Sequence, residues 1–95
     1  MSQIKVVIAD DESIIRLDLK TLLEEMGHAV VGEAADGQRA IELTRSLKPD
    51  VVIMDIKMPV MDGLDAAKVI SEEKIAPVVL LTAYSQKDLI ERAKE

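Results

Sequence analysis

Cysteine, phenylalanine and tryptophan are absent from this 95-residue sequence, and tyrosine occurs only once. The absence of cysteine excludes disulfides, thiolate metal sites and cysteine nucleophiles within the chain. Since aromatic side chains are almost lacking, any hydrophobic core has to be built from the aliphatic residues that dominate the 48% apolar fraction. The length then predicts one globular domain with a modest core.

Long apolar runs are also missing. No run reaches the length that crosses a bilayer, and the first residues do not show a basic segment followed by an apolar stretch. We therefore expect a cytoplasmic protein without a membrane segment. The 18 acidic and 12 basic side chains give a net charge of -6, which disfavours nucleic-acid binding by this chain and favours a cation site.

The apolar residues occur in four short runs rich in β-branched side chains. These runs predict strands near residues 4–9, 29–34, 51–55 and 78–82. Helical spacing predicts helices near residues 13–26, 37–47, 64–73 and 86–95. Because the strands are continuously apolar and alternate with helices, we expect an α/β fold with a doubly wound parallel sheet, buried on both faces.

The first predicted helix has an apolar face that should cover the sheet. Ser13 is expected to cap this helix and Gly27 to end it. The face consists of Ile15, Leu19, Leu22, Leu23 and Met26.

The pattern of alternating strands and helices ends within the predicted helix 86–95. A sheet of four strands would leave an apolar edge open at Val78–Leu81. We therefore expect residues 1–95 to form a domain that is incomplete at its C-terminal side. Its open edge would favour dimerisation or strand exchange between chains.

Acidic residues follow two of the predicted strands. Asp10 and Asp11 come directly after the first strand, and Asp55 ends the third. If these strands are neighbours, the three carboxylates converge at the carboxyl edge of the sheet, where ligands bind in such folds. Mg²⁺ suits such a group of hard oxygen ligands, and a carboxylate beside it can act as a nucleophile toward phosphorus. Thr82, after the fourth strand, would add a hydroxyl group at the same edge.

A simpler interpretation of the acidic residues remains open at this point. Acidic side chains that precede a helix are common N-terminal caps, and they interact favourably with the helix dipole. Taken alone, neither the first acidic run nor Asp55 indicates a binding site. Their combination with Thr82 favours one.

In its motifs and their order, the sequence resembles the receiver domains of bacterial two-component response regulators. The resemblance rests on Ile8–Glu12, Ala35–Gly37, Pro49–Pro59, Met61–Gly63 and Leu81–Ala83. It implies a CheY-like, flavodoxin-like strand order 2-1-3-4, with the fifth strand and fifth helix of the family absent from this chain.

The resemblance also implies a role for each site residue. Asp55 would accept the phosphoryl group, and Thr82 would contact that group on activation. Asp10, Asp11, Asp55 and the main-chain carbonyl of Lys57 would bind Mg²⁺. The chain would assist its own phosphorylation and dephosphorylation without being an enzyme, and a sensor histidine kinase would be its partner.

A narrower resemblance concerns the output of the protein. Residues 14–19, 31–37 and 82–93 are similar to those of regulators with a C-terminal RNA-binding antitermination domain of the ANTAR class. Such a domain would contact RNA and control transcription, and it is not contained in this chain.

Two other functions remain as alternatives. A lysine and an aromatic residue that the family carries on its fifth strand are absent, and Lys57 cannot replace that lysine because it leaves the third strand in a loop. Without these two residues, the chain could be a receiver-like interaction module that is not phosphorylated. A phosphatase that works through an aspartyl-phosphate is the second alternative, but it would want an acid where Lys57 stands.

Overall fold

The computed structural model describes residues 3–81 of the chain, and the predicted helix 86–95 and Thr82 lie outside them. Strands and helices alternate along the described part. Their order is β1 (Lys5–Ala9), α1 (Ser13–Glu25), β2 (Ala29–Ala34), α2 (Gly37–Leu47), β3 (Val51–Asp55), α3 (Gly63–Glu72) and β4 (Val78–Leu81).

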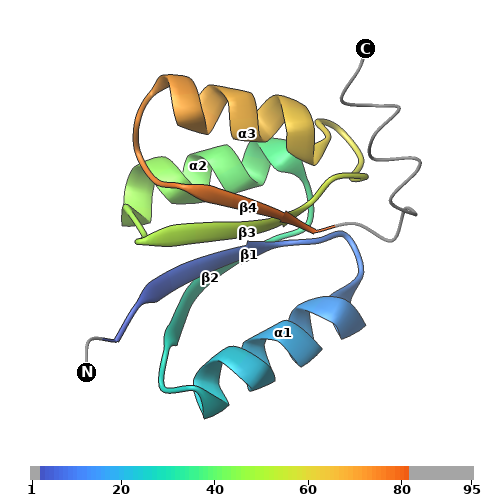
Figure 1. The fold of residues 1–95 in the computed structure, drawn as a ribbon. Helices are drawn as coiled ribbons and strands as arrows, with labels where there is room; N and C mark the ends of the chain where they lie inside the picture. Colours follow the sequence, from blue (N-terminus) through green and yellow to red (C-terminus); the bar gives the residue numbers. More distant parts are fainter. Residues whose placement is uncertain (1–2, 82–95) are drawn as a thin grey trace.

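The strands form one parallel sheet in the order β2-β1-β3-β4, which confirms the predicted fold class and strand order. Figure 1 shows α2 and α3 on one face of the sheet and α1 on the other. The chain reverses its direction of travel across the sheet after β2, so β1 and β3 lie side by side at the centre. This topological switch brings the carboxyl ends of both strands to the same edge.

The main core lies between the sheet and the helices α2 and α3. Alternate residues of the central strands face these helices, because successive side chains of a strand point to opposite faces. The buried cluster contains Val7, Ala9, Ala34, Ala40, Ile41, Val52, Met54, Met58, Ala66 and Ile70. Aliphatic and methionine side chains therefore build the core, as the scarcity of aromatic residues requires.

The first helix is less buried than the sequence predicts. No residue of α1 is fully buried, and Leu22 and Met26 of the expected apolar face are 57% and 68% exposed. Within residues 3–81, α1 is the only helix on its face of the sheet, so its flank has no neighbouring helix to pack against. The prediction that all five apolar positions cover the sheet is therefore wrong for this part of the chain.

Several element boundaries also differ from the predicted ones. β1 begins at Lys5, α1 ends at Glu25, and α3 begins and ends one residue earlier than predicted. The predicted cap Ser13 is instead the first helical residue. Glu12 occupies the N-cap position with extended backbone angles, and its side chain makes no capping hydrogen bond.

The last described strand lies at an edge of the sheet. Within the described residues β4 pairs with β3 alone, and Val79 and Leu80 are 49% and 37% exposed. Pairing or exchange of this strand between chains stays a prediction. None of the helices in residues 3–81 combines the length and the apolar character needed to cross a membrane.

Candidate functional site

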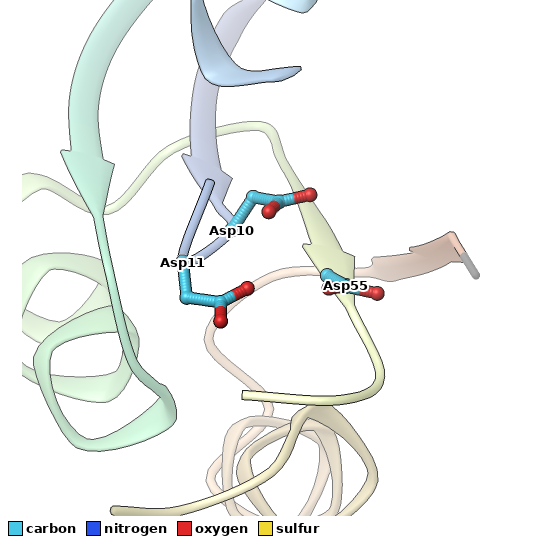
Figure 2. A group of neighbouring side chains, drawn as sticks. All are labelled: Asp10, Asp11 and Asp55. Carbon is cyan, nitrogen blue, oxygen red and sulfur yellow. The ribbon is translucent and has the colours of Figure 1, made fainter. Parts of the chain in front are cut away.

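The strand register brings three acidic residues to one place. Ala9 of β1 pairs with Met54 of β3, so the next residues, Asp10 and Asp55, lie at the same level at the carboxyl ends of the two strands. Figure 2 shows the side chains of Asp10 and Asp11 after β1 and that of Asp55 at the end of β3. One carboxylate oxygen from each residue lies within 4.8 Å of those from the other two. The predicted convergence of these acids is therefore observed.

Asp10 is the most enclosed of the three acids, with only 3% of its surface exposed. Its backbone N–H donates to the carbonyl oxygen of Ala34 at 2.9 Å, which ties it to the end of β2. Its Oδ1 atom accepts a hydrogen bond from the backbone N–H of Glu12 at 2.8 Å. The turn between β1 and α1 is thus closed by the Asp10 carboxylate, while Asp11 lies exposed beside it.

Asp55 is partly buried, and its surroundings disfavour its charged form. Burial and the neighbouring negative charge of Asp10 raise the pKa of the Asp55 carboxyl above its ordinary value, and Asp11 adds to the effect. Hydrogen bonds from the backbone N–H groups of Lys57 and Ile56 act in the opposite direction but do not cancel it. Backbone donors therefore orient the Asp55 carboxylate, while burial and the charge of Asp10 disfavour its ionised form.

The loop after Asp55 returns to the end of β3 through Gly63. The backbone N–H of Gly63 donates to the carbonyl oxygen of Ile56 at 2.7 Å. A Cβ atom at position 63 would lie only 2.0 Å from the carbonyl oxygen of Asp55. The sequence indicates Gly63 as part of a helix start, but this contact with the backbone of Asp55 is visible only in the folded structure.

The donor atoms of the acidic site fit a hard divalent cation. Two unit charges 4.8 Å apart repel each other by roughly 3 kcal/mol at an effective dielectric constant of about 20. A cation between the carboxylates would reverse the sign of this interaction. Mg²⁺ prefers oxygen ligands and commonly binds through one or two carboxylates with retained waters, so the set of Asp10, Asp11 and Asp55 suits it.

The other predicted site residues have different outcomes. The structure places Lys57 in the loop after β3, where its N–H group contacts Asp55. Whether its carbonyl binds a metal stays a prediction. Thr82 follows Leu81, which pairs with Asp55, but Thr82 itself lies outside the described residues.

The raised pKa of Asp55 predicts how stability depends on pH. The folded state holds this proton more tightly than the unfolded state, so the free energy of unfolding should fall as pH rises from the ordinary carboxyl pKa of 3.8 through the raised value. Asp55→Asn removes this loss. Without divalent cations, we expect the variant to be more stable than the wild type at neutral pH, and the difference to vanish below the ordinary pKa.

Urea denaturation across a range of pH measures this effect. Asp18→Asn is a suitable control. Asp18 is exposed on α1, and its substitution removes one negative charge at a position away from the site. If Asp55→Asn and the wild type have the same free energy of unfolding at neutral pH, the destabilising effect of the Asp55 charge is contradicted.

Comparison with known proteins agrees with this fold. Residues 6–95 match the family model of the response regulator receiver domain. The chain is 57% identical over 91 residues to the transcriptional regulatory protein PdtaR of Mycobacterium tuberculosis, covering 96% of this chain and 44% of that protein. It is 46% identical over 86 residues to protein-glutamate methylesterase/protein-glutamine glutaminase 3 of Hahella chejuensis, covering 90% of this chain and 25% of that protein.

A solved structure shows the same similarity in three dimensions. The signal receiver domain of the putative response regulator NarL from Mycobacterium tuberculosis superposes with a TM-score of 0.88 at 32% identity, covering 99% of this chain and 77% of that one. The chain spans less than half the length of the two curated relatives. The part that these otherwise different proteins share with it is the receiver domain, and the chain belongs to the family of response regulator receiver domains.

Proposed function

We propose that this chain is the phosphoacceptor domain of a cytoplasmic two-component response regulator, and that Asp55 receives the phosphoryl group from a partner histidine kinase in the presence of Mg²⁺. The observation that carries the proposal is the convergence of three carboxylates, from the ends of β1 and β3, within 4.8 Å. Structural ion pairing does not explain this group, since its members carry the same charge. A cation and a dianionic phosphoryl group do explain it.

The three acids would divide the work between them. Asp10 and Asp11 would bind Mg²⁺ together with Asp55 and the main-chain carbonyl of Lys57. When bound, Mg²⁺ neutralises the charge that otherwise prevents a phosphoryl dianion from approaching three carboxylates. Asp55 is suited to be the acceptor because it is only partly buried and because backbone N–H groups orient its carboxylate.

The transfer itself is a displacement at phosphorus. A carboxylate oxygen of Asp55 forms a bond to the phosphorus atom while the bond from phosphorus to the donor histidine nitrogen breaks, and the imidazole keeps that electron pair. Hydrolysis later returns phosphate and restores the Asp55 carboxylate. The chain is modified on its own side chain in this cycle, and so it acts as a switch and not as an enzyme on a separate substrate. Thr82 would contact the transferred group.

The output of the switch is proposed from the relatives and the sequence. PdtaR is named a transcriptional regulatory protein, and its length leaves room for another domain beyond the part matched here. Together with the ANTAR-like segments of the sequence, this supports an RNA-binding antitermination domain that responds to phosphorylation. The control would act through the affinity difference between the phosphorylated and unphosphorylated surfaces of the receiver.

Intact-mass spectrometry tests this function. After incubation of the protein with a small acyl phosphate and Mg²⁺, we expect the mass to increase by one phosphoryl group, and a chelator to prevent the increase. No mass gain with Mg²⁺, although the protein is folded, would favour an interaction module without phosphorylation. Sustained turnover of a phosphomonoester would favour a phosphatase.

Removal of one proposed metal ligand tests the role of the acid pair. Asp11→Asn is expected to weaken Mg²⁺ binding at least as much as the loss of an outer-shell partner does, which is about 10-fold to 100-fold. Isothermal titration calorimetry of the unphosphorylated protein measures this affinity. Glu12→Gln is the control, because the exposed Glu12 side chain neighbours the site without belonging to the carboxylate group. Equal losses in both variants would contradict the assignment of Asp11.

A further inference from the structure

Arg16 contacts the peptide group that joins the two neighbouring acids. Its Nη1 atom donates a hydrogen bond of 2.6 Å to the carbonyl oxygen of Asp10. That oxygen belongs to the peptide bond between Asp10 and Asp11, and a peptide group is planar. A hydrogen bond that holds this carbonyl therefore also fixes the direction in which the chain proceeds to Asp11.

The guanidinium group of Arg16 is itself fixed by a partner on the sheet. Its Nε atom donates to Oε1 of Glu33, on β2, at 3.2 Å. The Arg16 side chain is 20% exposed, and Lys20 lies 4.0 Å from the other Glu33 oxygen. Because the donors of a guanidinium lie in one rigid plane, anchoring Nε on Glu33 determines where Nη1 points.

The contacts of Arg16 complete the fixation of Asp10. The N–H group of Asp10 donates to Ala34, its Oδ1 atom accepts from Glu12, and its carbonyl accepts from Arg16. The residue is thus tied to β2 and to both ends of the first turn of α1. Metal sites gain affinity when such surrounding contacts orient the ligands in advance.

We propose that Arg16 is the positioning residue of the divalent-cation site, and that Glu33 orients it by anchoring its guanidinium group. The inference rests on the proposed function, because it takes Asp10 and Asp11 as ligands of Mg²⁺. Arg16 acts through the Asp10–Asp11 peptide and not by contact with the cation.

Electrostatics alone would give the opposite effect, and this difference makes the inference testable. A positive charge near a cation site weakens cation binding, so its removal should strengthen binding if Arg16 acts only by its charge. If Arg16 positions the ligands, its removal should weaken binding although the repulsion is also removed. The direction of the change in Mg²⁺ affinity therefore separates the two roles.

Calorimetric titration of Mg²⁺ into the unphosphorylated protein tests the proposal in Arg16→Met and Arg39→Met. Arg39 is the matched control, because it pairs with Glu42 on the exposed side of α2 and its removal changes the net charge equally. We expect the Mg²⁺ Kd to rise about 10-fold in Arg16→Met, the lower end of outer-shell effects, and to change little in Arg39→Met. An unchanged or lowered Kd in Arg16→Met would overturn the proposal.

Two further measurements keep the test decisive. The NMR signal of the Asp11 amide, which belongs to the held peptide, should move in Arg16→Met before Mg²⁺ is added and stay in place in Arg39→Met. If Arg16→Met does not fold, Arg16→Lys decides instead, since lysine keeps the charge and the aliphatic stem but lacks the planar fork. A raised Kd in Arg16→Lys supports the proposal, and a wild-type Kd contradicts it.

Failure of this proposal can be distinguished from failure of the proposed function. A folded wild-type protein that shows no saturable Mg²⁺ binding contradicts both. Saturable binding by the wild type with unchanged affinity in the Arg16 variant contradicts the positioning role alone.

Discussion

The Asp55→Asn variant is expected to gain no phosphoryl group from a small acyl phosphate under conditions in which the wild type gains one. Asparagine has nearly the same shape as aspartate, so the end of β3 and its contacts with the backbone of Lys57 should persist. Its neutral amide, however, does not attack phosphorus as a carboxylate does. The same substitution is expected to stabilise the fold at neutral pH when no divalent cation is present, because the pKa of Asp55 is raised by burial and by Asp10.

This combination separates a chemical defect from a folding defect. A variant that is more stable than the wild type and yet cannot be phosphorylated has lost the reacting group and not the structure. Asp18→Asn, on the exposed surface of α1, should be phosphorylated like the wild type. A full phosphoryl gain in Asp55→Asn would show that another side chain is the acceptor.

Among the substitutions proposed for this chain, Gly63→Ala should lower the free energy of unfolding the most. In Gly63→Ala, the new Cβ would lie 2.0 Å from the carbonyl oxygen of Asp55 and 2.9 Å from the Cα atom of Ile56. Both neighbours are backbone atoms, which cannot rotate away as a side chain can. Either β3 or the start of α3 must shift, so we expect a loss of about 3 kcal/mol or more in the free energy of unfolding.

The backbone movement caused by Gly63→Ala should also affect the acidic site, since the crowded carbonyl belongs to Asp55 itself. Urea denaturation measures the stability, and Mg²⁺ titration of the folded variant measures the site. Gly32→Ala serves as the control because its Cβ would meet the ends of the flexible Leu47 and Leu43 side chains at 2.9 Å and 3.5 Å. We expect a smaller loss there. Equal losses at both positions would contradict the close approach of Gly63 to β3.

The fold and the acidic site were largely accessible to sequence reasoning. Continuous apolar runs such as Val51–Met54 predict strands, and their alternation with helices predicts a parallel sheet. In such a sheet the carboxyl ends of β1 and β3 meet at one edge, so the sequence alone predicts that Asp10, Asp11 and Asp55 lie close together, as they do. The chemistry of the site follows from where strands end, which is a local feature of the sequence.

Other features depend on tertiary distances that the sequence pattern does not contain. The apolar spacing of α1 predicts which side faces the sheet, but its actual burial depends on neighbouring elements, and Met26 remains 68% exposed. The contact of Gly63 with β3 arises where a loop closes back on a strand. Likewise, Arg16 looks like an ordinary helical cation until its distances to Asp10 and Glu33 are known.

Identification of the modified residue tests the central claim most directly. Borohydride reduces an acyl phosphate on aspartate to homoserine, and peptide mass spectrometry then locates that residue in the chain. After phosphorylation of the wild-type protein with Mg²⁺, we predict homoserine at position 55 and none when a chelator is present. Homoserine at position 10 or 11, or none at any position in a protein that has gained a phosphoryl group, would contradict the assignment of Asp55 as the acceptor.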